Sequence, residues 1–393
     1  MATNSLDLDK LKDVVQDGNI NFLIGSGLSV PFLSSLGNIE DLLTDLDKRT
    51  DIDDAKKSIV RAFLYKRYCE QVIFKNIQVL EEDAGAVGVM ENYKKFLTII
   101  NSILLNRKNP ILSKQINLFT TNVDIFLEKS LEAIKLEYSD GFSGRFVPTF
   151  NLSNFRRSVS KKSLQYDNVS EIPVFNLLKL HGSLTWELHE ASGEKGIKFC
   201  TDLRHVKKVK AQDTSGIAEA QAGQSLDDLI TQSSGKRLST SITDFLNAYQ
   251  DFPIINPTKD KFKQTLLNQI HYELLRMYAN ELEKENSVLF VMGFSFADEH
   301  IREITLRVAD SNPTLMIYIV AHSSASVAGY EAKLGIKDAK NKNIKIIVPK
   351  KKDDVDEDEF NYDFANINSR IFEPLADKID SGKRSRFQNH GHE

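Results

Sequence analysis

The sequence contains only two cysteines, Cys69 and Cys200, and they lie far apart along the chain. Two isolated thiols are too few for a disulfide framework, and they are typical of a reducing compartment. They also exclude a structural zinc site built from four cysteines. We therefore expect a cytoplasmic protein that has neither a disulfide framework nor zinc, and no metal site is predicted.

Long apolar runs and an excess of one charge are missing as well. No stretch approaches the ~18 uninterrupted apolar residues that a membrane span needs. The N-terminal segment MATNSLDLDKLKDVV has early acidic residues and lacks the apolar centre of a secretory signal. Lysine and arginine number 51 against 55 acidic residues, a net charge of −4. We therefore expect that the protein neither associates with a membrane nor binds nucleic acid directly.

Six short runs of apolar, β-branched and aromatic residues predict buried strands. They lie at 20–24, 116–120, 174–180, 287–292, 315–321 and 344–348. Because these runs are apolar at consecutive positions, both of their faces should be covered, as in a parallel sheet between helices. The alternation of strands with helical segments predicts an α/β protein with an open, doubly wound parallel sheet of the Rossmann type.

Helices are predicted at 39–77, at 93–105 and, most clearly, at 261–285. In the last segment, apolar residues recur every four positions, at Phe262, Leu266, Ile270, Leu274, Tyr278 and Leu282. This spacing places them on one stripe of a helix. His271 lies beside that stripe, and we expect it to be a residue at the edge of the packing.

The chain of 393 residues is predicted to form one large domain at 1–348, followed by a charged C-terminal tail at 349–393 that includes His390 and His392. After the first strand comes a helical insertion at about 34–110, far longer than an ordinary crossover. A second, variable insertion lies at about 185–255, and its part at 211–241 has the composition of a mobile loop. The two insertions are expected to form a helical lobe.

A glycine-rich segment, Gly25-Ser26-Gly27-Leu28-Ser29, directly follows the first predicted strand. Glycine lets the backbone turn sharply and approach a phosphate closely, and Ser29 can donate to a phosphate or cap the next helix. The full dinucleotide fingerprint G-x-G-x-x-G is absent, because Val30 stands in place of its third glycine. An ordinary strand-to-helix turn is the alternative explanation.

Three further polar segments also close predicted strands. They are Thr120-Thr121-Asn122-Val123-Asp124, then Lys179-Leu180-His181-Gly182-Ser183, then Gly293-Phe294-Ser295-Phe296. Asn122 and Asp124 can face a ligand or cap a helix, and Ser295 can cap the helix that Asp298-Glu299-His300 opens or contact a nucleotide. His181 can act as a base, bind a ribose hydroxyl or be purely structural. Since all four segments end parallel strands, they should gather at one edge of the sheet, where ligands of such sheets bind.

Taken in order, GSGLS, TTNVD, KLHGS and GFSF resemble the motif series of the sirtuin family. In that family a G-A-G-x-S loop holds the phosphates of NAD, a T-Q-N-x-D segment lines the nicotinamide pocket, and an H-G pair supplies the catalytic histidine. A final G-T-S-type turn contacts the adenosine half. The resemblance spans the chain from Asn21 to about Ala321, although only the short motifs are specific.

The departures from the family are equally informative. Protein-deacylating sirtuins carry a zinc ribbon of two C-x-x-C pairs, which this chain cannot build, and their G-I-P-D-F-R segment is replaced by Val30-Pro31-Phe32-Leu33. The sequence looks more like the bacterial sirtuin-like proteins of antiphage defence, whose domains hydrolyse NAD. That resemblance implies a homo-oligomer and a separate protein partner, such as a translocase-like ATPase or another defence sensor.

The resemblance implies an NAD glycohydrolase that releases nicotinamide and ADP-ribose. Asn122 would orient a water and the nicotinamide ribose, His181 would accept a proton, and Asp124 would bind the carboxamide or only cap a helix. The implied NAD-binding residues are Gly25, Ser26, Gly27, Ser29, Thr121, Gly293 and Ser295. The alternatives are a non-catalytic sensor of NAD or ADP-ribose, a residual deacylase, and an assembly subunit of a defence complex.

Overall fold

The structure is a computed structural model that describes residues 7–34, 39–107, 109, 111–191, 194–255, 265–336, 340–349 and 360–389. At its centre lies a seven-stranded sheet in the order β13-β12-β11-β1-β2-β8-β3, in which every neighbouring pair is parallel. Its strands are β1 (Asn19–Ile24), β2 (Gln115–Thr120), β3 (Glu137–Ser139), β8 (Val174–Lys179), β11 (Ser287–Met292), β12 (Met316–Val320) and β13 (Ile344–Ile347). The six predicted strands are confirmed, and β3 is a short addition at the edge.

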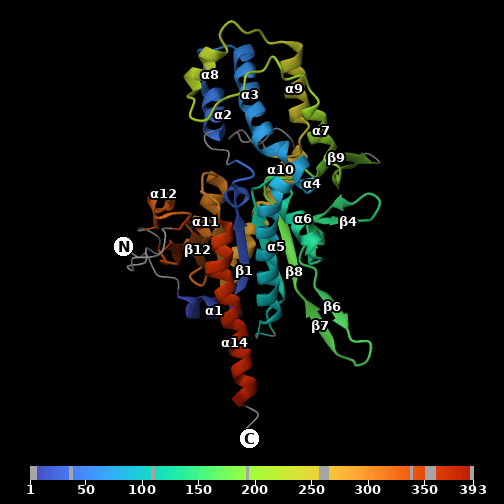
Figure 1. Cartoon of the computed structure of the whole chain (residues 1–393), viewed down its shortest axis with the longest axis vertical. Helices are drawn as coiled ribbons and strands as arrows, with labels where there is room; N and C mark the ends of the chain where they lie inside the picture. The colour runs from blue at the N-terminus through green and yellow to red at the C-terminus, as the bar shows by residue number, and fades with distance from the viewer. Residues whose placement is uncertain are drawn as a thin grey trace.

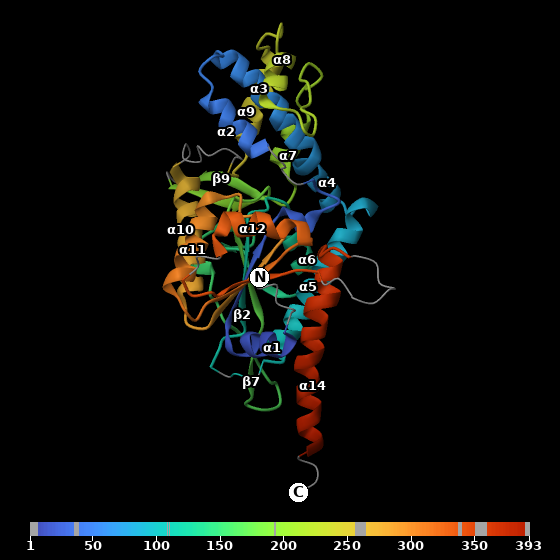
Figure 2. The same ribbon diagram turned by 90° about the vertical axis from the view of Figure 1, so that its left-hand side faces the viewer.

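Helices cover both faces of this sheet (Figure 2). In β1, Phe22 faces a core shared with α1 (Leu8–Asp17), α5 (Ala84–Leu105) and α14 (Glu373–Asn389). Leu23 faces the opposite core, against α10 (Thr265–Glu283), α11 (Glu299–Ser311) and α12 (Val327–Leu334). Because successive side chains of a strand point to opposite faces, a strand that is apolar at every position serves two cores. The predicted α/β class is therefore confirmed.

Helices from two distant parts of the chain pack together beyond one end of the sheet (Figure 1). We call this group the distal bundle; it consists of α2 (Ile39–Lys48), α3 (Asp54–Tyr68), α8 (Leu226–Gln232) and α9 (Thr240–Gln250). The ring of Tyr65 stacks on that of Tyr249, with centroids 3.9 Å apart. The bundle therefore joins helices of the segments 39–68 and 226–250.

Shorter elements connect the sheet, the distal bundle and the flanking helices; the symbol η marks a short 3₁₀- or π-helix. They are η1 (Ser26–Ser29), η2 (Cys69–Ile73), α4 (Lys75–Leu80), α6 (Phe126–Ala133), η3 (Leu152–Asn154), α7 (Arg204–Lys210), η4 (Ser324–Ser326), α13 (Phe364–Ile367) and η6 (Asn368–Phe372). Among the described residues, no helix combines the length and the apolar character that crossing a bilayer requires.

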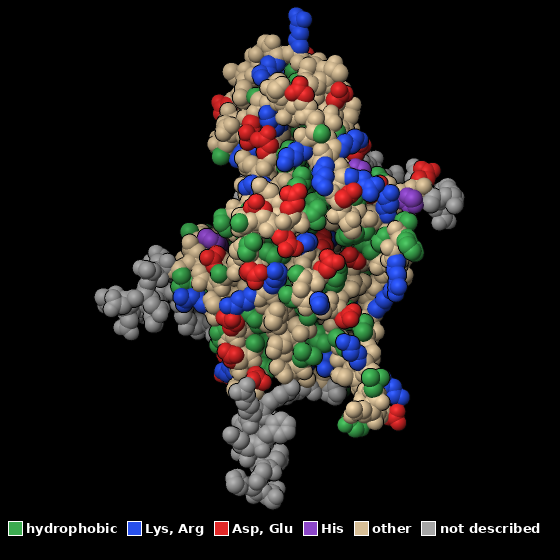
Figure 3. Space-filling model, turned by 45° about the vertical axis from the view of Figure 1, so that its right-hand side comes forward, with side chains coloured by type: hydrophobic (Ala, Val, Ile, Leu, Met, Phe, Trp, Pro, Cys, Tyr) green, Lys and Arg blue, Asp and Glu red, His purple; other side chains and the backbone are tan. Residues whose placement is uncertain are grey.

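Two antiparallel sheets, both absent from the sequence-based expectations, lie beside the central one. The first has the order β4-β5-β10-β9, formed by β4 (Phe142–Ser143), β5 (Thr149–Phe150), β9 (Trp186–Ala191) and β10 (Glu194–Phe199). The second is a hairpin of β6 (Val159–Lys162) and β7 (Val169–Ile172), which stands away from the body in Figures 1 and 3. Its tip residue Leu164 is fully exposed. The strands β4 to β7 have only two to four residues each, and the six-residue β9 and β10 lack the continuous apolar runs by which the central strands were predicted.

The predicted charged tail at 349–393 differs from the structure over its described part. Residues 364–389 are helical, and Ile371, Phe372, Leu375 and Ile379 are buried in the core that faces α5. The ring of Phe372 lies 5.5 Å from that of Phe96, centroid to centroid. The stretch 350–359, which carries the charge blocks, and His390 and His392 lie outside the described residues.

Candidate functional site

Each of the four polar segments lies at the carboxyl end of a central strand. We call them the glycine loop (25–29, after β1), the asparagine loop (121–124, after β2), the histidine loop (180–183, after β8) and the aspartate loop (293–298, after β11), and together the edge loops. β1 pairs with β2 on one side and with β11 on the other, so the order of the chain reverses at β1. Such a reversal opens the crevice where ligands of open α/β sheets bind.

The glycine loop and the aspartate loop pack backbone against backbone. Gly25 N–H donates to the Met292 carbonyl over 2.9 Å, and Gly27 N–H donates to the Gly293 carbonyl over 3.0 Å. A Cβ atom on Gly25 would lie 2.3 Å from the Gly293 oxygen, and Gly293 itself has a φ of +62°. This close packing requires glycine. Backbone packing by itself accounts for these glycines, and the N–H groups of Gly25 and Gly27 are already bonded within the protein.

The glycine loop and the asparagine loop are joined through two buried side chains. Ser29 Oγ donates to Asp124 Oδ2 over 3.0 Å and lies 3.0 Å from the Tyr93 hydroxyl. Asp124 Oδ1 accepts the backbone N–H of Phe126 over 3.2 Å, at the start of α6. Burial raises the pKa of Asp124, and the positive charge of Lys179 opposes the rise. Ser29 is fully buried, so its hydroxyl binds Asp124 and does not face outward toward a phosphate.

A buried lysine connects the asparagine loop to the histidine loop. Lys179 Nζ lies 3.0 Å from Glu128 Oε1 and donates to the backbone carbonyl of Asp124. Ser183 Oγ donates to the same Glu128 oxygen over 3.1 Å, and Leu184 N–H donates to the Val123 carbonyl over 3.1 Å. A buried charge costs free energy unless it is paired. The pair Lys179–Glu128 therefore holds these two loops together, a role that the sequence did not indicate.

Asn122 is buried, and its amide is not committed to the fold. Its backbone N–H donates to Thr120 Oγ1, which in turn donates to the Ile24 carbonyl. The side-chain amide lies beside the Tyr93 hydroxyl; burial raises the pKa of Tyr93 well above its usual value, and the amide opposes this rise. Within the described residues, however, neither polar atom of the amide meets hydrogen-bond geometry with a partner. Leaving a buried amide unpaired costs about 1–3 kcal/mol, so a ligand or water that reached these atoms would supply the missing hydrogen bonds.

The histidine loop and the aspartate loop meet through His181 and Asp298. His181 Nε2 lies 3.0 Å from Asp298 Oδ2, and Asp298 Oδ1 caps α11 by accepting the Ile301 N–H over 3.1 Å. Of the two roles that the sequence allowed for Ser295, capping this helix is wrong, because Asp298 is the N-cap and Ser295 is exposed. Asp298 was not selected as a site residue, although its position at the start of a helix is visible in the sequence.

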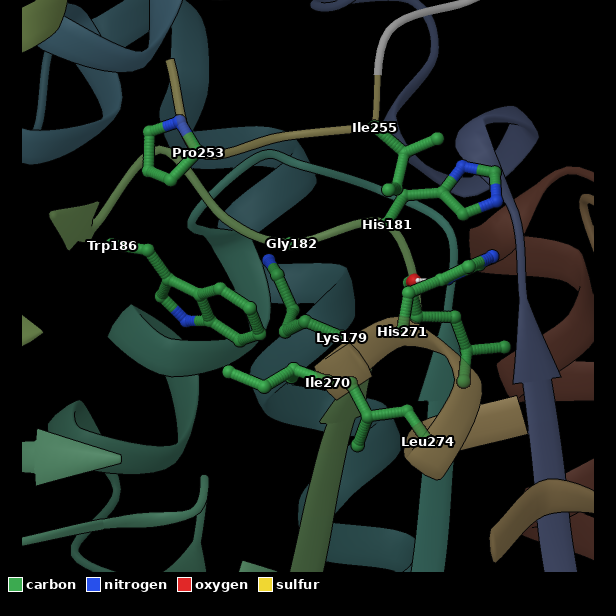
Figure 4. A pocket seen from close by; sticks show the side chains of 10 residues that line it. Lys179, His181, Gly182, Trp186, Pro253, Ile255, Ile270, His271 and Leu274 are labelled. Atoms are coloured by element: carbon green, nitrogen blue, oxygen red, sulfur yellow. Dashed lines mark hydrogen bonds between the residues drawn. The ribbon is translucent and has the colours of Figure 1, made fainter. Parts of the chain in front are cut away.

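The backbone of the histidine loop is bonded to two neighbouring segments, and Figure 4 shows His181 among the side chains of Pro253, Ile255 and His271. Ile255 N–H donates to the His181 carbonyl over 2.9 Å. Gly182 has a φ of +78°, and a Cβ there would lie 2.3 Å from the Pro253 carbonyl oxygen. His271 Nδ1 lies 2.6 Å from the Leu180 carbonyl, so this nitrogen carries a proton. His271 is thus a buried anchor of the histidine loop and not a residue at the packing edge.

The cavity between these residues, which Lys179 and Trp186 also line, has a volume of about 10 Å³, room for about one water molecule. Elsewhere in the described part of the chain, no group of histidine, cysteine and acidic residues is arranged to hold a metal ion. Both cysteines are buried and unpaired with each other.

The contacts form a closed ring: glycine loop to asparagine loop, asparagine loop to histidine loop, histidine loop to aspartate loop, and aspartate loop back to glycine loop. Of the predicted site residues, those that hold this ring together are Gly25, Gly27, Ser29, Asp124, His181 and Gly293. Asn122 offers unpaired groups, whereas Ser26, Thr121 and Ser295 make none of the contacts described above.

A scan against protein-family models finds no match to the chain, and a search of curated proteins finds no similar sequence.

Proposed function

We propose that the protein binds NAD along the edge loops and hydrolyses its nicotinamide–ribose bond. The observation that carries this proposal is the buried, unpaired amide of Asn122 in a loop that belongs to the closed ring. In the sirtuin-like series that the sequence resembles, the corresponding asparagine acts at the nicotinamide ribose. An amide that the fold buries and leaves unpaired suits such a role, because a ligand would supply the missing hydrogen bonds.

The position of the glycine loop also supports a dinucleotide. It lies at the end of β1, where the strand order reverses, and in doubly wound sheets dinucleotides lie across that crevice. Ser26 is half-buried and Gly27 is exposed, so this turn offers surface for the pyrophosphate. Thr121 would flank the nicotinamide half, and Gly293 with Ser295 would contact the adenosine ribose.

The reaction needs water and one proton acceptor. The bond from C1′ to the nicotinamide nitrogen breaks, its electron pair goes to the pyridine ring, and a water oxygen bonds to C1′. The water proton passes to His181, and the products are nicotinamide and ADP-ribose. Asn122 would hold the water and the ribose in reactive positions, which can supply much of the rate. Because both Asp124 oxygens have protein partners, Asp124 would hold Ser29 and α6 in place and not the carboxamide.

The test is nicotinamide release from NAD by the purified chain, compared with Asn122→Ala and His181→Ala. We expect each substitution to lower the rate by about 10²–10⁴-fold, the contribution typical of a positioned acid–base group. Matched controls are Asn247→Ala on α9 and His189→Ala on β9, outside the edge loops. Thermal melting of each variant separates a catalytic loss from unfolding.

Two other outcomes would each contradict part of the proposal. Release that survives both substitutions would place the chemistry elsewhere. NAD or ADP-ribose binding by calorimetry, with no release even after addition of lysate from phage-infected cells, would identify a sensor instead of an enzyme.

A further inference from the structure

His181 and Asp298 come from strands that are not neighbours. β8 and β11 are separated in the sheet by β1 and β2, so the contact between Nε2 and Oδ2 spans the ends of both intervening strands. The two side chains are largely buried, with 17% of the His181 side chain and 6% of the Asp298 side chain exposed. For two side chains to meet across two intervening strands, both the histidine loop and the aspartate loop must adopt specific conformations.

The aspartate loop is held in a conformation that ordinary residues avoid. Phe296 has a φ of +55°, which costs about 1–2 kcal/mol for a residue with a side chain. Its ring is fully buried against Phe294, with centroids 5.1 Å apart. Tyr330 donates to the Phe294 carbonyl over 3.0 Å, and Lys333 donates to the Ser295 carbonyl over 3.0 Å. Strain of this kind persists only where surrounding contacts enforce it, so the position of Asp298 is specified by the fold.

We propose that Asp298 is the positioning residue for His181 and fixes the proton of the neutral imidazole on Nε2. A carboxylate accepts hydrogen bonds but does not donate them, so it favours the tautomer that carries hydrogen on the facing nitrogen. Nδ1 then keeps the lone pair and is the atom that accepts a proton from water. The proton transfer itself rests on the proposed NAD hydrolysis, whereas the tautomer does not.

Asp298 can fill this role and cap α11 at the same time, because its two oxygens have different partners. Oδ1 accepts the Ile301 N–H, and Oδ2 faces the imidazole. The Nε2–Oδ2 distance is 3.0 Å, although the ring N–H direction is not aligned with the carboxylate in this conformation. Hydrogen bonds at catalytic groups are often poorly aligned before substrate binds.

The substitutions that test this role keep the helix cap. Asp298→Asn preserves both size and capping, since asparagine caps as well as aspartate, but it presents an amide to the imidazole. Asp298→Ser also caps but is too short to reach His181. Asp53→Asn is the matched control, because Asp53 caps α3 in the distal bundle by accepting the Lys56 N–H over 2.7 Å.

We expect Asp298→Asn and Asp298→Ser to lower kcat for nicotinamide release by about 10–100-fold, as when the partner that orients a functional histidine is removed. KM should stay within about twofold, and Asp53→Asn should leave both constants unchanged. A rise in KM without a fall in kcat, or full activity in both variants, would overturn the proposal. A rise in turnover would do so as well, because the contact would then block the site.

A second readout does not require activity. In the full chain labelled with ¹⁵N-histidine and assigned with His181→Gln, we expect the neutral form of the His181 ring to carry hydrogen on Nε2, and a shift toward the Nδ1–H form in Asp298→Asn. An unchanged tautomer in that variant would refute the positioning role even if NAD is hydrolysed. The expected tautomers without any hydrolysis would sustain the pairing while the proposed function fails.

Discussion

Among single residues, Asp140 couples the stability of the fold to pH. Burial raises the pKa of Asp140 to about 6; the negative charge of Glu128 adds to the rise, while Lys179 and the Phe142 N–H bond oppose it. The unfolded chain has an ordinary aspartate pKa of about 3.9, so the folded protein binds this proton more tightly. The stabilising contribution is present below about pH 4 and is lost as pH rises through about 6.

Asp140→Asn should remove this dependence. Asparagine keeps the acceptor for the Phe142 N–H, which Asp140 Oδ1 accepts over 3.0 Å, but carries no charge to bury. We expect the variant to be more stable than the parent at pH 8 by up to about 3 kcal/mol, from a shift of about two pKa units. Urea denaturation at pH 5 and pH 8 measures the difference. The control is Asp244→Asn on α9, where the aspartate is exposed. If the free energy of unfolding changed equally with pH in the parent and in Asp140→Asn, the pH dependence would not come from Asp140.

Among the elements, the segment from η6 to α14 is an integral part of the core. Phe372 contacts Phe22, Phe96 and Phe290, with ring centroids 5.5–5.7 Å apart. It therefore joins a helix near the end of the described chain to the central strands β1 and β11 and to α5. Removing such a ring takes away apolar contacts and leaves a cavity.

Phe372→Ala should lower the free energy of unfolding by about 3–5 kcal/mol. The matched control is Phe146→Ala, since Phe146 is fully exposed beside the β4–β5 turn and its loss should change stability by less than about 0.5 kcal/mol. Guanidinium denaturation of the two variants compares them directly. Similar midpoints for both would mean that the 364–381 segment is not docked in solution.

For the whole molecule, the arrangement connects the distal bundle to two of the edge loops. α2 follows the glycine loop in the chain, and α9 leads into Ile255, whose N–H bonds to the His181 carbonyl. A displacement of the bundle would therefore act on both loops, although they leave different strands of the sheet. This connectivity offers a physical route by which a partner that contacts the bundle would alter the candidate site.

We therefore expect low NAD turnover from the isolated chain, because an unregulated hydrolase would deplete the NAD of its own cell. Oligomer formation or a protein partner should raise the rate. Turnover by the purified chain, alone and in lysate from phage-infected cells, measures the effect, and size-exclusion chromatography reports the oligomeric state in parallel. High constitutive turnover by a monomer would contradict this prediction.

Some contacts could not be predicted because their partners are remote in sequence. Gly25 was expected to approach a phosphate, but its partner is the Gly293 backbone. Ser29 was expected at a phosphate and instead binds Asp124. The apolar spacing of Phe364, Ile367, Ile371 and Leu375 was visible in the sequence, but the charge blocks at 350–359 led to the prediction of a solvated tail.

The sequence by itself determined six strands of the central sheet, the α/β class and the placement of four polar segments at strand ends. Local patterns suffice there, because a strand covered on both faces is apolar at consecutive positions. Only the tertiary structure decided that Asn122 keeps an unpaired amide, that Asp298 faces His181, and that Lys179 pairs with Glu128. These features depend on atoms from distant segments meeting within a few ångströms, and no local pattern encodes which segments meet.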